Sequence, residues 1–293
     1  MRHLFSPNIE PKDEDYRSLR DDGRYSEQRD FAEYLWQKYE PYADRQFLAA
    51  IASEFHPRFW EMYLGCAILK QNITLVSSGN KKRGGPDLCF SRDQDSVWIE
   101  AIAPTPGSGV DAVPQLSLSG QAFTVPDVNI TLRYTAAISE KSRKYDGYLE
   151  KCILTSSDSY IIAVNGQNVY PILLEDEVPR IVKAVLSLGS PSITLNPDTF
   201  EIVDQGYAHR PVLWKAKGSQ VPTDTFFDPA FSGISGLIFS MADVWTGSRV
   251  LGSDFFYVHN PLAANPLPKG WLPIGIEYWV EDDKLRSCNW NEA

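Results

Sequence analysis

The sequence predicts an α/β protein. Its apolar patterns run in the order helix, three strands, helix, strand, which mixes both kinds of element within one stretch of chain. Hydrophobic residues make up 43% of the 293 residues, with 8 Trp, 14 Tyr and 14 Phe, a composition too rich for a disordered chain. This length allows one large domain or two modest ones, each with a sizeable core.

The charge balance argues against a general polyanion binder. The formal charge is 28 − 38 = −10, whereas nonspecific phosphate affinity grows with accumulated Lys and Arg. Any nucleic-acid function therefore needs a local basic site. The four cysteines form no CxxC pair, no apolar run approaches about 18 residues, and the amino terminus lacks a signal-peptide core. We therefore expect a soluble, cytoplasmic protein with no membrane association.

The first part of the chain is predicted to be helical after a polar leader. Residues 1 to 25 are charged and non-periodic, so we expect a loosely docked surface arm without core residues. Helical spacing predicts a helix from about Glu27 to Glu40 and a short one from Phe47 to Phe55. A third helix opens at Pro57, and its apolar face is so broad that protein should cover it on more than one side.

The elements after the third helix alternate between strands and helices. Three strand-like runs come first, and they are Ile73 to Ser77, Asp87 to Phe90, and Val97 to Ala103. A proline-rich surface excursion, residues 104 to 126, then precedes a long helix from about Asn129 to Lys151. The later predictions are strands at Tyr160 to Val164, Ile234 to Ser240 and Phe255 to His259, and a helix at Glu177 to Leu188.

Glu100 is a charge in an otherwise apolar strand. The two-residue period of a strand places it on the same face as Trp98 and Ile102. Burying this carboxylate without a partner would cost several kcal/mol. It therefore needs a neutralising group, which can be a structural ion pair or a bound cation.

Two further carboxylates can reach the same place. Asp87 follows Gly84-Gly85-Pro86, and it faces Glu100 if the two neighbouring strands pair. Carboxylates in contact repel unless a divalent cation lies between them. Glu61 lies at the edge of the apolar face of its helix. Taken singly, Asp87 also fits a turn residue, and Glu61 fits a solvated helix edge.

The long helix carries a lysine within its apolar stripe. The 100° helical step puts Lys141 among Tyr134, Ile138 and Tyr145, so its amine should point at an anion or a carboxylate. The alternative is a lysine whose stem packs while its amine reaches water. Arg133 and Lys144 lie beside Lys141 and can form a cationic rim.

The densest basic cluster, Lys81 to Arg83, directly precedes the Gly-Gly-Pro-Asp segment. Such a run at a hairpin tip is usually solvated surface. Beside a metal-binding aspartate it can instead contact phosphates, which would supply the local basic site that the acidic composition demands.

In this order the residues resemble the PD-(D/E)XK nuclease superfamily over about residues 55 to 166. The match consists of Glu61, Pro86-Asp87, Glu100-Ala101-Ile102 and Lys141 with their helices and strands. The resemblance implies a central mixed β-sheet flanked by helices, with a restriction-endonuclease-like αβββαβ core. It also implies that Asp87, Glu100 and the carbonyl of Ala101 bind Mg²⁺ or Mn²⁺, with Glu61 as an additional ligand.

One position departs from the family pattern. Ile102 stands where the motif lysine is expected, so Lys141 becomes the substitute that orients the attacking water. On this reading the chain divides into an N-terminal arm and helical extension (1–54), a nuclease-like core (55–170), and a C-terminal α/β extension (171–293) that completes or decorates the same domain.

The resemblance implies a Mg²⁺-dependent nuclease acting on nucleic acid, most readily a DNA endonuclease, and by analogy it allows a homodimer. Its catalytic residues would be Asp87, Glu100, Lys141 and Glu61. Its substrate contacts would be Lys82, Arg83, Arg133 and Lys144. Two alternatives stay open: a catalytically inactive module of this fold that serves in binding, and an unrelated α/β binding protein.

Overall fold

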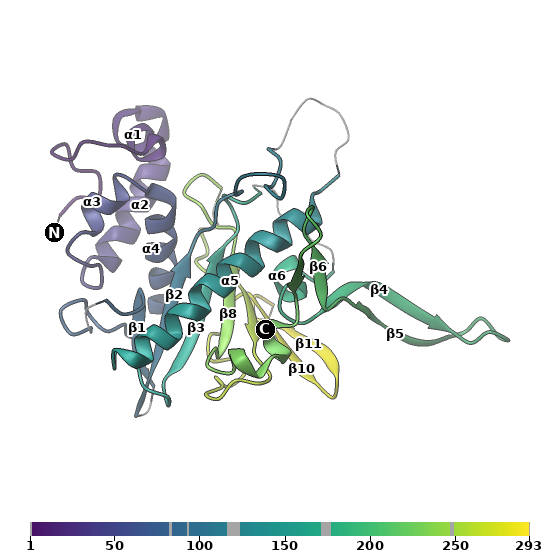
Figure 1. Cartoon of the computed structure of the whole chain (residues 1–293). Helices are drawn as coiled ribbons and strands as arrows, with labels where there is room; N and C mark the ends of the chain where they lie inside the picture. The colour runs from purple at the N-terminus through teal and green to yellow at the C-terminus, as the bar shows by residue number, and fades with distance from the viewer. Residues whose placement is uncertain are drawn as a thin grey trace.

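The computed structural model describes residues 2–81, 84–92, 94–115, 124–170, 177–246 and 249–292. They form an α/β fold around one seven-stranded mixed sheet with the order β1-β2-β3-β8-β9-β10-β11. The N-terminal helices and the long helix α5 lie on different sides of this sheet (Figure 1). The predicted α/β class with a central mixed sheet flanked by helices is therefore confirmed.

Strands from both halves of the chain build this sheet. Their bounds are β1 Leu88–Arg92, β2 Asp95–Ile102, β3 Ser159–Asn165, β8 Gly236–Ser240, β9 Phe256–His259, β10 Ile276–Glu281 and β11 Lys284–Asn289. Strands β2, β3 and β8 are parallel neighbours, and β9 is parallel to β10. Antiparallel pairs close the two edges, β1 with β2 and β10 with β11.

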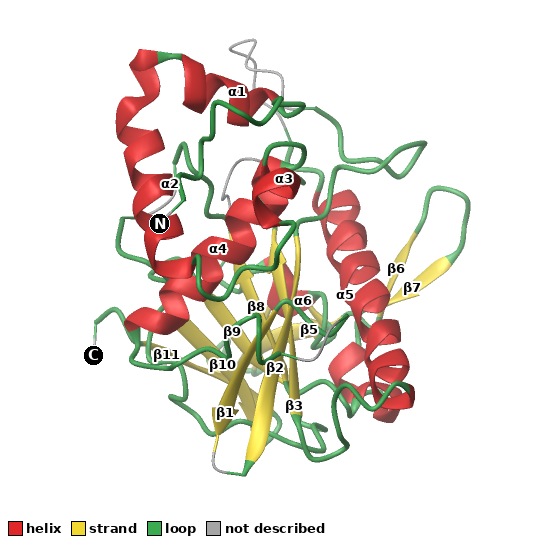
Figure 2. Ribbon diagram, turned by 90° about the vertical axis from the view of Figure 1, so that its left-hand side faces the viewer, coloured by secondary structure: helices red, strands yellow, loops and turns green. Residues whose placement is uncertain are grey.

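Helices cover both faces of the sheet (Figure 2). Their bounds are α1 Glu14–Asp21, α2 Ser26–Tyr39, α3 Phe47–Ile51, α4 Phe55–Lys70, α5 Asp127–Glu150 and α6 Arg180–Lys183. Side chains alternate along β3: Ile161 belongs to the core with α1 to α4, and Ile162 to the core with α5 and α6. Because both faces are covered, every residue of β3 is buried.

Helix α4 is the centre of the N-terminal layer. It is buried from Phe55 to Ile68 apart from Pro57 and Arg58, and it contacts α2, α3 and β2. Trp60 donates a hydrogen bond from Nε1 to the carbonyl of Ala163 on β3, at 3.1 Å. The prediction that protein covers this helix on more than one side is confirmed.

The prediction for residues 1 to 25 is wrong, because this segment contributes to the core. Leu4, Tyr16 and Leu19 are fully buried, and the Tyr16 hydroxyl donates to the Leu4 carbonyl at 2.9 Å. Asp13 caps α1, while its second carboxylate oxygen accepts from the backbone N–H of Phe55 at 3.0 Å. A few widely spaced large side chains therefore attach the leader to α4 without producing a regular pattern.

Two other predicted elements differ in the structure. The run Ile73 to Ser77 is not a strand, since it makes only one isolated bridge, from Leu75 to Phe90. Of the predicted helix at Glu177 to Leu188, only the single turn α6 is helical, because Pro179 precedes it and Ser187 has a left-handed backbone with φ 56°. The described part of the excursion at 104 to 126 contains no helix or strand before α5, as predicted.

Two hairpins outside the main sheet had no clear sequence signal. Strands β4 (Leu188–Leu195) and β5 (Ile202–His209) form one, which projects from the body of the protein (Figure 1). Strands β6 (Val212–Trp214) and β7 (Gln220–Pro222) form the other, beside α5. Among the described residues, no helix is long and apolar enough to cross a membrane.

The buried leader predicts a measurable loss of stability in Leu19→Ala. Removing this fully buried side chain should lower the free energy of unfolding by about 2–5 kcal/mol. Ile193→Ala, at a position that is 61% exposed on β4, should change it by less than about 0.5 kcal/mol. Urea titration measures both variants, and equal losses would show that the leader does not belong to the core.

Candidate active site

Strand register brings Asp87 beside the C-terminal part of β2. Leu88, the first residue of β1, pairs with Ile99, so the preceding residue lies beside Glu100 and Ala101. Oδ2 of Asp87 accepts a hydrogen bond from the backbone N–H of Ala101 at 2.7 Å. The predicted pairing of the two strands is confirmed, and it places two carboxylates at the same edge of the sheet.

Glu100 lies on the face of β2 that α5 covers, and it is only 3% exposed. Its Oε1 accepts from the ammonium groups of Lys141 at 2.8 Å and Lys144 at 2.7 Å, and its Oε2 accepts from the Tyr148 hydroxyl at 2.8 Å. Burial raises the pKa of Glu100, but the two ammonium groups outweigh it, so the pKa lies below its usual value. The neutralising group that the sequence demanded is thus a pair of lysines.

The three donors to Glu100 come from one face of α5. Residues 141, 144 and 148 are three and four positions apart, which places them one above another on a helix. Lys141 is 8% exposed, so the alternative of an amine reaching water is wrong. Lys144 is different, because its side chain is 44% exposed and its ammonium group borders solvent.

Asp87 has an unusually high pKa, about 7. Burial is the largest cause, and the neighbouring charges of Glu61 and Glu100 add to it. The Ala101 N–H and the charge of Lys141 lower the pKa but do not compensate. Among the described residues only Oδ2 of Asp87 accepts a side-chain or backbone hydrogen bond, so this carboxylate is poorly satisfied when ionised.

Glu61 approaches Asp87 from the helical layer on the other face. It is 5% exposed, so a solvated helix edge is the wrong description. Its Oε1 accepts from the Tyr39 hydroxyl and its Oε2 from Arg58, both at 2.7 Å. Tyr39 remains a donor, because burial and the charge of Glu61 raise its pKa well above the usual value.

Asp87 and Glu61 line an open cavity of about 490 Å³. Its other walls come from the loop before β1 and from the segment between α2 and α3, through Arg45 and Lys81 among others. The Lys81 ammonium donates to the backbone carbonyl of Asp87. This hydrogen bond keeps the charged amine of Lys81 at the cavity. A molecule entering from solvent therefore meets an acidic group flanked by cations.

The remaining predicted residues divide into three cases. Arg133 does not join the cluster around Glu100, because its Nε donates to the carbonyl of Thr105 at 2.8 Å and its side chain lines a separate pocket. The N–H of Ala101 binds Asp87, and its carbonyl points to the same edge, since the N–H and C=O of a strand residue share a direction. Lys82 and Arg83 lie outside the described residues.

Sequence reasoning missed several members of the site. Tyr39 and Tyr148 bind carboxylates, but their sequence positions are equally typical of core aromatic residues. Helix α4 begins at Phe55, two residues before the Pro57 at which the sequence predicts its start. Arg58 lies three residues before Glu61, a spacing that suits an ion pair and could have been recognised. Arg45 carries no local pattern that links it to Asp87.

The oxygen atoms present suit a hard divalent cation. Among the described residues, no three His, Cys, Asp or Glu side chains form a metal-binding group. Two carboxylates and one backbone carbonyl, from Asp87, Glu100 and Ala101, are nevertheless the type of ligand that Mg²⁺ prefers, with water completing its shell. Three donors occupy Glu100, which leaves acceptor capacity on Oε2, and no donor among the described residues binds Oδ1 of Asp87.

No protein-family model, curated protein or solved structure matches this chain. Two carboxylates with opposite pKa shifts lie side by side, one satisfied by lysines and one left with a near-neutral pKa beside an open cavity. Such divergent pairs are typical of sites that bind cations or transfer protons.

The pKa of Asp87 predicts an inverse pH dependence of stability in the metal-free protein. The folded pKa of about 7 lies above the usual 3.8, so between these values the folded chain retains a proton that the unfolded chain has released. The free energy of unfolding should therefore fall as the pH rises from 4 to 7. Asp87→Asn keeps an acceptor for Ala101 but cannot ionise, so it should remove this decline.

The measurement is urea unfolding in EDTA at pH 5 and pH 8. At pH 8 the free energy of unfolding of Asp87→Asn should exceed that of the wild type by on the order of 1 kcal/mol. At pH 5 the difference between the two free energies should be smaller. Asp198→Asn, at an exposed position between β4 and β5, controls for the loss of one negative charge. A constant gap across the pH range would contradict the raised pKa.

Proposed function

We propose that this protein is a Mg²⁺-dependent nuclease that hydrolyses phosphodiester bonds in nucleic acid, with DNA as the favoured substrate. The observation that carries the proposal is the contact between β1 and β2, where Asp87 binds the backbone of Ala101 beside a Glu100 that Lys141 neutralises. It supports an acidic cation site with an ammonium group built into it, at an open cavity.

The topology supports a restriction-endonuclease-like core. Helix α4 precedes the antiparallel pair β1–β2, and α5 connects β2 to its parallel neighbour β3. The first of the three core strands is represented by the segment around Leu75, which runs beside β1 through a single bridge. Strands β8 to β11 extend the same sheet, which agrees with a C-terminal region that completes the domain.

Asp87, Glu100 and the carbonyl of Ala101 would hold the cation, and Glu61 would act from the opposite side as an accessory acid. A bound Mg²⁺ would lower the pKa of a water molecule and neutralise charge on the phosphate. The charge of Glu61 reaches Asp87, as the pKa of Asp87 indicates, so Glu61 adds negative potential for a cation. Tyr39 and Arg58 would fix the position of its carboxylate.

Lys141 takes the place of the motif lysine absent at Ile102. Its ammonium group binds Glu100, and its charge lowers the pKa of Asp87, so it lies close to both carboxylates. From this position it would orient the attacking water. The more exposed Lys144 and Lys81 would contact phosphate oxygens of the substrate.

A second candidate function is a binding module of the same fold without catalysis. The network around Glu100 favours it, because Lys141, Lys144 and Tyr148 neutralise and satisfy this carboxylate without any metal. The two functions differ in their response to Mg²⁺. A catalytic site gains stability and activity from the cation, whereas the closed network does not.

Nuclease activity is tested with supercoiled plasmid and circular single-stranded DNA in millimolar Mg²⁺. The wild type should cleave, and Asp87→Asn and Lys141→Met should each lose at least about 100-fold in rate, because each removes one part of the hydrolytic site. Lys70→Ala, at an exposed residue that ends α4, should cleave like the wild type. Equal rates in all four proteins, or cleavage that persists in EDTA, would remove the assignment.

Cation binding is tested separately by thermal unfolding with and without Mg²⁺. A ligand that binds only the folded state raises the unfolding temperature. The wild type and Lys141→Met should show this rise, whereas Asp87→Asn should not. Absence of any rise in the wild type would favour the non-catalytic module, and the unfolding curves also show whether each variant is folded.

A further inference from the structure

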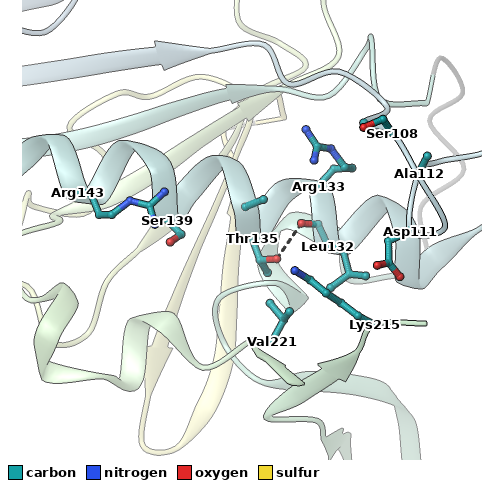
Figure 3. Close-up of a pocket in the computed structure, with 12 residues that line it drawn as sticks. Ser108, Asp111, Ala112, Leu132, Arg133, Thr135, Ser139, Arg143, Lys215 and Val221 are labelled. Atoms are coloured by element: carbon teal, nitrogen blue, oxygen red, sulfur yellow. Dashed lines mark hydrogen bonds between the residues drawn. The ribbon is translucent and has the colours of Figure 1, made fainter. Parts of the chain in front are cut away.

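A second pocket, of about 430 Å³, lies between α5, the loop after β2 and the β6–β7 hairpin (Figure 3). It belongs to a different face of α5 from the one that binds Glu100. Arg143 lines this pocket and lies two residues from Lys141, which corresponds to about 200° around a helix. Arg143 therefore lies nearly opposite Lys141 on the helix, whereas Arg133, eight residues before Lys141, lies about 80° from it.

The pocket is cationic. Arg133 and Arg143 come from α5, and Lys215 reaches toward the helix from the β6–β7 hairpin (Figure 3). Within the described residues, none of these three side chains makes an ion pair with a carboxylate. Asp111 is the one acidic residue among the lining residues, and its Oδ1 accepts the backbone N–H of Ala216 at 2.7 Å. Three cationic side chains thus line one pocket, and none of them has an ion-pair partner in the part of the chain that the structure describes.

Fixed contacts hold the walls of the pocket in place. The carbonyl of Thr105 accepts from Nε of Arg133, while the bond from Ala216 to Asp111 joins the same loop to the β6–β7 hairpin. Gly107 has a left-handed backbone with φ 85°, and a Cβ there would lie 3.2 Å from the Arg133 guanidinium. The loop can therefore pass close over Arg133 only with glycine at this position. Arg133 is therefore held in place before any ligand arrives.

The pocket also lies near the candidate active site along the chain. Thr105 is four residues after Ala101, and four extended residues span at most about 14 Å. The loop that binds Arg133 therefore begins close to the carbonyl that would face the cation. A strand of nucleic acid that passes the cleavage site can reach the pocket within a few nucleotides.

We propose that the pocket formed by Arg133, Arg143 and Lys215 binds the phosphate backbone of a single strand of nucleic acid outside the cleavage site. The proposal extends the proposed nuclease function to a second surface. Guanidinium and ammonium groups are the usual phosphate contacts, and two neutral hydroxyl donors also line the pocket, Ser108 from the loop and Ser139 from α5. Proteins that bind single-stranded nucleic acid commonly hold its phosphate backbone with cationic side chains like those of this pocket.

Trp214 favours a nucleic-acid strand over a small phosphorylated ligand. It directly precedes Lys215 and is 57% exposed. Leu213 and its cross-strand partner Val221 face α5, so the indole stands on the other face of the hairpin, beside the pocket rather than in it. An exposed aromatic ring next to phosphate-binding cations is a surface on which a base can stack.

The test is fluorescence anisotropy with a labelled single-stranded 20-nucleotide DNA in EDTA, over a range of salt concentrations. Arg143→Ala/Lys215→Ala should weaken binding at least about 10-fold. It should also reduce the slope of log K against log salt by about 1.4, which is two contacts at 0.7 each. Lys284→Ala/Arg286→Ala removes two exposed cations from β11, at the far edge of the sheet, and should bind like the wild type.

Failure of this proposal and failure of the nuclease assignment give different results. Binding in EDTA does not depend on hydrolysis, so the wild type should bind the labelled DNA in this assay even if no protein cleaves. If the pocket and control double variants bind the DNA equally well, or if the wild type does not bind it, the proposal that the pocket binds the phosphate backbone is overturned.

Trp214→Ala should weaken DNA binding at least about 5-fold. Pyrophosphate binding is measured for the same proteins. If Arg143→Ala/Lys215→Ala loses pyrophosphate binding but keeps DNA binding, the pocket is a small-anion site and the proposal is wrong.

Discussion

The buried carboxylate of Glu100 constrains the structure more than any other single group. An unpaired charge at this depth in a sheet would cost several kcal/mol, so it must have partners. Those partners come from α5, where Lys141, Lys144 and Tyr148 all reach the same carboxylate. This contact fixes which face of α5 meets β2. It thereby also directs Arg143 to the other side of the helix, into the cationic pocket.

The surroundings of the two neighbouring carboxylates shift their pKa values in opposite directions. Among the described residues, Glu100 has three donors and a lowered pKa, whereas Asp87 has one backbone donor and a pKa near neutrality. The difference follows from position, because Glu100 faces a helix rich in ammonium groups and Asp87 lies between two acids. An ionised Asp87 is therefore a source of instability that a divalent cation would relieve. This imbalance is the strongest physical argument that the site is built for a ligand.

Charged residues that interrupt an apolar pattern were the most informative part of the sequence. Glu100 in a strand and Lys141 in a helical stripe could be recognised because each breaks a period, and the structure joins them. Contacts made by residues that suit a core in any case could not be recognised, which is why Tyr148 was missed. The core position of Leu4 was missed for a related reason, since its contacts are with Tyr16 of α1 and Glu33 of α2, which local spacing does not reveal. Asp87 became visible only through the glycines and proline before it.

The net charge of −10 does not conflict with a nucleic-acid function, because charge distribution decides the local potential. Several basic side chains of the N-terminal layer, such as Arg2, Arg20 and Arg24, form ion pairs with nearby carboxylates and contribute little outward field. The cations around α5 differ, since Arg143 and Lys215 have no such partner among the described residues. A polyanion approaching this molecule would be repelled by much of its acidic surface and attracted to local basic sites such as this pocket. Such a surface favours a single binding register over nonspecific coating, which is what the proposed hydrolytic site would require.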